Sequence, residues 1–101
     1  MNPIRKPATA GETMKFEFEL EVSKYLVKNM SGGDIIVAFN PPDQGDNSWL
    51  IPDEAWQVIP GADTNEYHKT LYVTASATSA TVRGVEVEAI EYKLPIQQKR
   101  S

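Results

Sequence analysis

Seven consecutive residues, Lys-Phe-Glu-Phe-Glu-Leu-Glu at positions 15–21, constrain the fold of this chain more than any other feature. Apolar and acidic side chains alternate strictly, which places Phe16, Phe18 and Leu20 on one face of an extended segment. This period of two residues is typical of a half-buried β-strand. Residues 85–89, Val-Glu-Val-Glu-Ala, repeat the pattern. Two distant segments therefore each predict a strand with one face toward a core and an acidic face toward water.

Glycine, proline, asparagine and aspartate divide the rest of the chain into short apolar runs, which is the pattern of an all-β domain. No apolar period of 3.6 residues persists for two helical turns, so we expect little or no helix, apart from one turn at residues 52–56. We predict a single antiparallel β-sandwich, with a jelly roll among the connectivities that fit. Its expected strands follow residues 15–22, 25–30, 34–39, 49–51, 56–59, 67–75 and 81–92.

Local features predict how the strands connect. The apolar phase flips after Val22, which indicates a bend at Ser23 and Lys24. Ser-Gly-Gly at positions 31–33 predicts a tight hairpin between the strands on either side, because glycine readily takes a positive φ. Gly84, at a phase change in the last strand, indicates a β-bulge. The polar, proline-containing residues 40–48 predict an exposed loop.

Charge divides the 101-residue chain into three parts. Residues 1–7 and 93–101 carry five basic and no acidic side chains, whereas residues 8–92 hold a net charge of −9. We therefore expect a domain at 8–92 between a basic N-terminal arm and a basic C-terminal tail, with the arms either solvated or reaching to a neighbouring acidic subunit. The acidic body would repel nucleic acid, so no nucleic-acid partner is expected.

The two acidic strands also carry an electrostatic constraint. If they were neighbours in register, Glu17, Glu19 and Glu21 would face Glu86 and Glu88, and like charges directly opposite each other are destabilising. We predict that these segments are not adjacent, or that basic side chains are interleaved between them.

Composition and the beginning of the chain suggest where the protein is made. It has no cysteine, so a disulfide framework and a thiolate metal site are excluded. No apolar run approaches the roughly 20 residues that a membrane helix needs, and the first residues do not resemble a signal peptide. We expect no membrane partner and a protein that is soluble and intracellular when it is synthesised.

Candidate catalytic and metal-ligating residues favour structural roles. His68 is the only histidine, and its position in an expected strand indicates a surface residue rather than part of a triad. The glutamates of the two acidic strands are expected on solvent faces, where a raised pKa is not expected. Asp and Asn side chains could bind Ca²⁺, but they lack regular ligand spacing, and turns favour the same residue types. We therefore predict no enzyme activity and no cofactor. The residues weighed as Ca²⁺ ligands are Asp34, Asp43, Asp46, Asn47 and Asp53.

Two groups of apolar residues are candidates for binding. Residues 35–39 are apolar on both faces of the expected strand, although a sandwich buries only one face. This pattern predicts an intersubunit or partner interface. Its residues are Ile35, Ile36, Val37 and Phe39. Aromatic side chains offer a different function, a small carbohydrate-binding module, because flat rings stack on sugars. That platform would use Trp49, Trp56 or Tyr72.

Three segments carry a resemblance to a known group of proteins. They are Lys-Tyr-Leu-Val-Lys-Asn-Met-Ser-Gly-Gly-Asp-Ile-Ile-Val-Ala-Phe from position 24, Trp-Leu-Ile-Pro from position 49, and Thr-Leu-Tyr-Val-Thr-Ala-Ser-Ala-Thr-Ser-Ala-Thr-Val-Arg-Gly-Val-Glu-Val from position 70. Their order resembles small virion-associated β-sandwich proteins of tailed bacteriophages, over residues 24–88. The resemblance implies a capsid-decorating, head-stabilising or tail-accessory structural protein. Such a protein would be made in the host cytoplasm, reside in the virion, and contact copies of itself or capsid and tail proteins.

Overall fold

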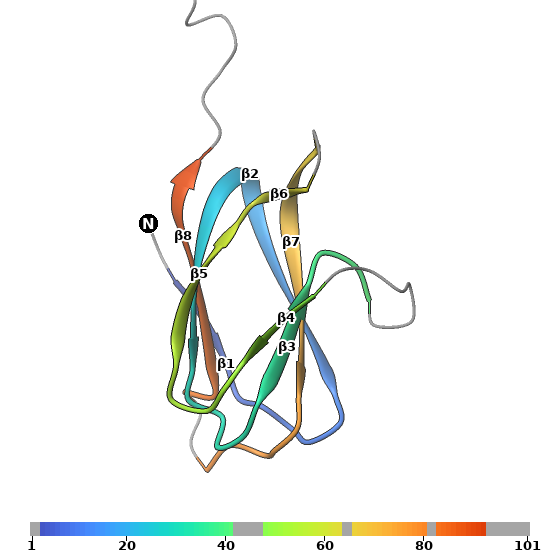
Figure 1. The fold of residues 1–101 in the computed structure, drawn as a ribbon, viewed down its shortest axis with the longest axis vertical. Helices are drawn as coiled ribbons and strands as arrows, with labels where there is room; N and C mark the ends of the chain where they lie inside the picture. The colour runs from blue at the N-terminus through green and yellow to red at the C-terminus, as the bar shows by residue number, and fades with distance from the viewer. Residues whose placement is uncertain (1–2, 42–47, 64–65, 81–82, 93–101) are drawn as a thin grey trace, which may run out of the picture.

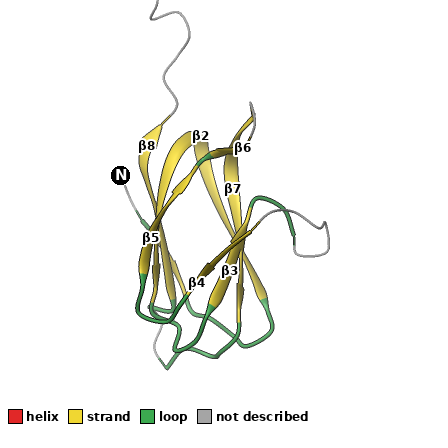
Figure 2. Ribbon diagram, in the orientation of Figure 1, coloured by secondary structure: helices red, strands yellow, loops and turns green. Residues whose placement is uncertain are grey.

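A computed structural model describes residues 3–41, 48–63, 66–80 and 83–92. Within these residues all strand pairs are antiparallel and no helix occurs, as Figures 1 and 2 show. The predicted all-β sandwich is confirmed. Its strands are β1 (Ile4–Lys6), β2 (Thr13–Asn29), β3 (Ile35–Ala38), β4 (Ser48–Ile51), β5 (Trp56–Pro60), β6 (Ala62–Asp63), β7 (Glu66–Ala75) and β8 (Val85–Tyr92).

The long strand β2 belongs to both layers of the sandwich. Its first part pairs with β7, and β3 and β4 extend that layer. Its second part lies between β8 and β5, and β1 pairs with the far side of β8 (Figure 1). The pairing shifts register between Glu17 and Val22 and again around Lys24, which confirms the predicted bend. In a jelly roll the strands divide between two sheets, whereas β2 here pairs in both layers, so the arrangement differs from a jelly roll.

The core lies between the two layers and receives buried side chains from β2, β3, β4, β5, β7 and β8, with Ile4 of β1 packed against it. Phe16 is fully buried, as its position in the alternating segment predicts, but Leu20 is 60% exposed. Leu20 follows the point where β2 loses its register with β7, so the simple alternation does not continue through the bend. The largest fully buried side chains are Phe16, Val22, Tyr25, Val27, Ile35, Val37, Ile51, Ile59, Leu71, Val73, Val85 and Val87.

The predicted hairpin at residues 31–33 is wrong, because this segment connects the two layers instead. Strand β3 pairs with β4 and β7, and not with β2. The buried Asn29 organises the crossing: its Nδ2 donates to the carbonyl oxygens of Gly33, Ile51 and Pro52 at 2.8–3.0 Å. Its Oδ1 accepts hydrogen bonds from the backbone N–H and the hydroxyl of Ser31. These bonds satisfy backbone groups at the place where the chain crosses between the layers.

The predicted N-terminal arm is also wrong over Ile4–Lys6, which form the edge strand β1. Arg5 pairs with Glu86 of β8 in the middle of this short ladder. Lys6 Nζ donates to the carbonyl oxygen of Lys15 at 2.7 Å and lies 5.4 Å from the centre of the Phe16 ring. The sandwich therefore begins before residue 8. The predicted tail at residues 93–101 lies outside the described residues, as do residues 42–47 of the predicted loop.

The electrostatic prediction about the acidic strands is confirmed. Only the second part of β2 pairs with β8, and there Lys28 faces Glu86 while Lys24 faces Glu91. The first, acidic part of β2 pairs with β7. Gly84 has a φ of +33° and precedes β8 rather than interrupting it, so the predicted bulge is wrong.

Candidate binding surface

The four residues predicted to form an interface divide between the core and the surface. Ile35 and Val37 are fully buried and Phe39 nearly so, because β3 directs alternate side chains inward and Phe39 follows it into the core. These three residues cannot form a surface, so that part of the prediction is wrong. Ile36 points outward and is 44% exposed.

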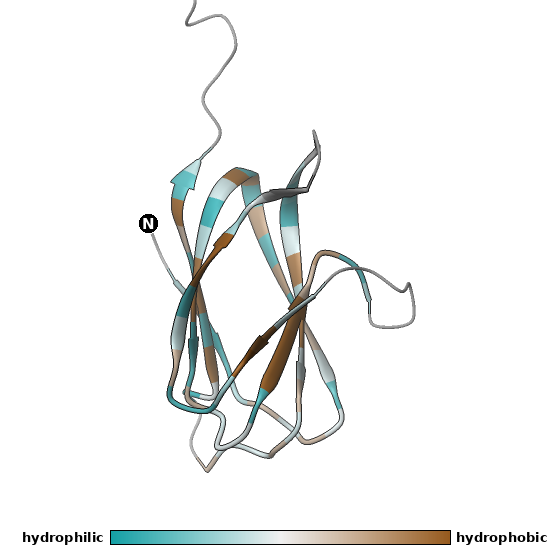
Figure 3. Cartoon of the chain, viewed as in Figure 1, coloured by the Kyte–Doolittle hydropathy of each residue, from teal (hydrophilic) through white to brown (hydrophobic). Residues whose placement is uncertain are grey.

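Ile36 lies in an apolar patch on the outer side of the β7-β3-β4 layer. It pairs with Leu50 of β4, which is 59% exposed, and with Thr74 of β7. In the next outward row, Ala38 pairs with Ser48 and Tyr72. Figure 3 shows the hydrophobic stretch of β3 beside that of β4. We call Ile36, Ala38, Ser48, Leu50, Tyr72 and Thr74 the outer patch.

A hollow of about 210 Å³ opens beside the outer patch. It is smaller than the roughly 300–1,000 Å³ of ordinary small-molecule pockets. Its lining combines the apolar side chains of Ile36, Ala38 and Pro41 with hydroxyls and one amide, a combination suited to an apolar side chain from another protein surface. The hollow is lined by Ile36, Ala38, Asn40, Pro41, Ser48, Tyr72 and Thr74.

The structure does not bring the three aromatic residues of the predicted sugar platform together. The Trp49 ring packs edge-on against the buried Phe39 ring, with centroids 5.4 Å apart. Trp56 lies on β5 in the other layer, where Lys28 Nζ is 4.3 Å from its ring centre. Tyr72 belongs to the outer patch. No two of these three rings make a shared surface for a sugar.

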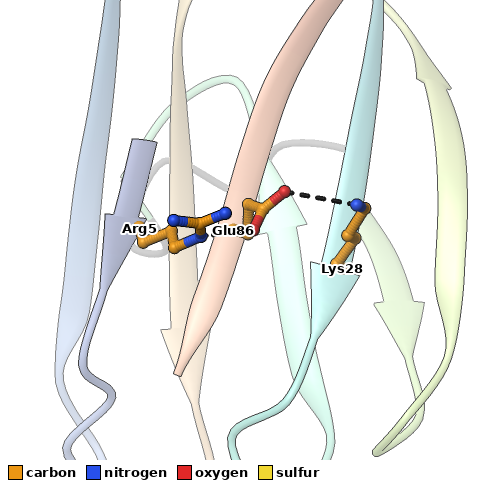
Figure 4. A network of polar contacts seen from close by, with 3 residues as sticks. All are labelled: Arg5, Lys28 and Glu86. Atoms are coloured by element: carbon orange, nitrogen blue, oxygen red, sulfur yellow. Dashed lines mark hydrogen bonds and ion pairs between the residues drawn. The ribbon is translucent and has the colours of Figure 1, made fainter. Parts of the chain in front are cut away.

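Sequence reasoning missed a row of interacting side chains across the outer side of the β1-β8-β2-β5 layer (Figure 4). Glu86 is only 4% exposed, and its carboxylate is 2.6 Å from Arg5 Nε and 3.3 Å from Lys28 Nζ. The hydrogen bond from Arg5, assisted by Lys28, holds the pKa of Glu86 below its usual value, although burial acts in the opposite direction. Glu86 is therefore ionised at neutral pH, and its salt bridges join β8 to β1 and β2. The prediction that Glu86 lies on a solvent face is wrong.

His68 and Asp53 have structural partners, and Asp34 is exposed. The His68 ring stacks on Phe39 with centroids 4.0 Å apart, so it is half-buried rather than a plain surface residue. Asp53 Oδ1 accepts a hydrogen bond from the N–H of Gly32, which is the role expected of a turn aspartate. The cluster at residues 43–47 lies outside the described residues. In the described part of the chain, no three His, Cys, Asp or Glu side chains gather where they could hold a metal ion.

Fold and surface together define a small antiparallel β-sandwich with an exposed apolar patch on the outer side of one layer. The chain matches no protein-family model, no curated protein and no solved structure. None of the described residues form a helix that could cross a membrane. Function is therefore inferred from the residues of this chain alone.

Proposed function

We propose that this protein is a non-enzymatic structural protein that acts through protein–protein contacts, as an accessory of a phage particle that decorates or stabilises the head or belongs to the tail. The observation that carries the proposal is the pair of exposed side chains Ile36 and Leu50, side by side on adjacent strands next to the hollow. Contiguous apolar surface of this kind marks contact sites between proteins.

The strength of one such contact can be bounded. Fully burying an aliphatic side chain stabilises by about 1.5–3 kcal/mol. Ile36 and Leu50 are each roughly half exposed, so covering both contributes about 1.5–3 kcal/mol before the cost of association. A single contact of this size is weak. It becomes effective where copies are joined to one another and bind a repeating surface together, because linked contacts gain avidity.

A particle built from repeated subunits offers such a surface, and the resemblance over residues 24–88 favours the same class of protein. The net charge of −4 agrees with binding to protein rather than to nucleic acid.

Particle incorporation tests the proposal. Virions would be purified from the strain that encodes this chain, and the protein quantified in them by mass spectrometry. We expect the wild-type chain in a fixed ratio to the capsid or tail subunits. Ile36→Glu should be lost from the particles, because the substitution places a charge in the outer patch.

Val58→Glu provides the matched control. Val58 is 51% exposed and lies on β5, in the opposite layer. Both variants should retain the melting temperature of the wild type within a few degrees, and Val58→Glu should still be incorporated. Absence of the wild-type chain from the particles, or equal incorporation of both folded variants, would contradict the proposal.

A further inference from the structure

Strand β4 is an open edge of its layer. It pairs with β3 on one side, and no described strand lies on its other side. An edge strand presents backbone N–H and C=O groups that only another extended segment can pair in series. The chemistry of the β4 edge therefore specifies an added β-strand as its partner.

The other edges carry features that obstruct strand addition. Strand β1 contains Arg5 and Lys6 within three residues, and Lys6 already donates to the carbonyl oxygen of Lys15 on the neighbouring edge of β2. Strand β5 ends in Pro60, which has no N–H to donate. By contrast, β4 reads Ser-Trp-Leu-Ile, without a charge or a proline, and its Leu50 is 59% exposed.

We infer that β4 pairs antiparallel with β4 of a second copy of this chain about a twofold axis, so that two layers join into one continuous sheet. The charges favour a second copy meeting at this edge. Each chain has a net charge of −4, and two copies approach with least repulsion where their contacting segments are uncharged. The Ser48–Ile51 segment meets that condition on both sides of the contact.

The alternation of β4 limits the register of this pairing. Ile51 is buried and Trp49 packs on the core, whereas Ser48 and Leu50 are exposed on the outer side. Directly opposed residues of an antiparallel pair share one face, so inward residues must oppose inward residues. Two registers satisfy this rule while pairing three residues of each β4, one with Leu50 opposite the second Leu50 and one with Leu50 opposite the second Ser48.

Both registers place the two outer patches side by side on the same face of the joined sheet, because the twofold axis is perpendicular to that sheet. The dimer would thus present twice the apolar surface to one partner. The inference rests on the proposed function only for the role of the doubled outer patch in binding a particle. The pairing of the two β4 strands does not require a particle.

Sedimentation equilibrium of the full chain tests the pairing without a particle. We expect a dimer at micromolar concentration for the wild type, and a folded monomer for Leu50→Lys, which adds a charge to the β4 edge. Val58→Lys, on the exposed edge strand β5, is the matched control and should remain dimeric. A wild-type monomer at about 100 µM, assemblies larger than a dimer, or dissociation caused by Val58→Lys and not by Leu50→Lys would overturn the inference.

Cross-linking checks which strands meet. The chain has no cysteine, so one introduced thiol is unique. Under mild oxidation, Leu50→Cys alone, or an equal mixture of Leu50→Cys and Ser48→Cys chains, should form a disulfide-linked dimer at least tenfold faster than Val58→Cys, because these two arrangements correspond to the two registers. Rates no higher than that of Val58→Cys in both arrangements would contradict the pairing. Failure of the dimer with normal particle incorporation would refute this inference alone, whereas an intact dimer that is absent from particles would refute the proposed function alone.

Discussion

The carboxylate of Glu86 accepts a hydrogen bond from Arg5 Nε at 2.6 Å, although 81 positions separate the two residues in the chain. The pair belongs to a cross-strand row in which Arg5 faces Glu86, Glu86 faces Lys28, and Lys28 faces Trp56. The row crosses all four strands of one layer and alternates cation, anion, cation and aromatic ring. Such charge-assisted contacts fasten the three-residue strand β1 to the sandwich.

Glu86→Gln should lower the free energy of unfolding by about 1–2 kcal/mol at pH 7, because a buried carboxylate bonded to two cations is replaced by a neutral amide. Urea denaturation measures the change. Glu88→Gln, two residues along the same strand and without a salt bridge in the described structure, should change it by less than about 0.5 kcal/mol.

The stability difference between the wild type and Glu86→Gln should depend on pH. The pKa of Glu86 is lowered by folding, so its contribution is complete above the ordinary glutamate pKa of about 4.3 and is lost as pH falls through the lower, folded value. The stability difference between wild type and Glu86→Gln should therefore stay constant from pH 7 to pH 5 and shrink below about pH 4. A difference that grows on acidification would show that the shift has the opposite sign.

Asn29→Ala should destabilise the fold by about 2–4 kcal/mol, because it leaves the hydrogen-bonding groups at the layer crossing without their buried partner. Asn29→Asp should be similarly harmful, since a carboxylate cannot donate to three carbonyl oxygens. Gln57→Ala, on the half-buried face of β5, is the control and should cost less than 1 kcal/mol by the same urea titration. Full stability of Asn29→Asp would contradict the donor role.

Deleting residues 1–6 should lower the melting temperature, because it removes β1 and the Arg5 contact. A loss of about 2 kcal/mol corresponds to roughly 8–16 °C for a domain of this size. Deletion of residues 1–2 alone spares β1 and should have no effect. Calorimetry distinguishes an integral edge strand from a dispensable arm, and equal melting temperatures for both deletions would favour the arm.

Two glycines should respond differently to alanine. A Cβ at Gly61 would overlap the backbone carbonyl of Val22, so Gly61→Ala should cost about 3 kcal/mol. Gly32 has a φ of +94° but open space around it, so Gly32→Ala should cost only the backbone strain of about 1–2 kcal/mol. Denaturation midpoints should therefore fall further for Gly61→Ala, and the reverse order would argue against the close approach of the β5–β6 corner to β2.

The sequence predicts the local character of the strands better than their partners. The alternation around Phe16 and the phase flip at Ser23 depend on neighbouring residues, and both appear in the structure. Ser-Gly-Gly at residues 31–33 predicts a hairpin because glycine takes the positive φ of tight turns. The same glycines also permit the crossing that the structure shows, and the choice depends on the buried side chain of Asn29.

The candidate site shows the same division between local and distant information. That Ile36 is exposed while Ile35 is buried follows from which face of β3 the other layer covers, and the apolar run alone does not contain that choice. The burial of Glu86 depends on Arg5, which no local pattern connects to it.

The pairing of β1 with β8 has a consequence for synthesis on the ribosome. Ile4 emerges long before its partner Val87, which lies in the last described strand. Strand β1 must therefore wait, unpaired, until β8 has been made, and β2 waits with one side of its second part open. Folding of the sandwich should complete only after β8 has left the ribosome, and a truncated product that lacks β8 would expose strand edges that invite aggregation.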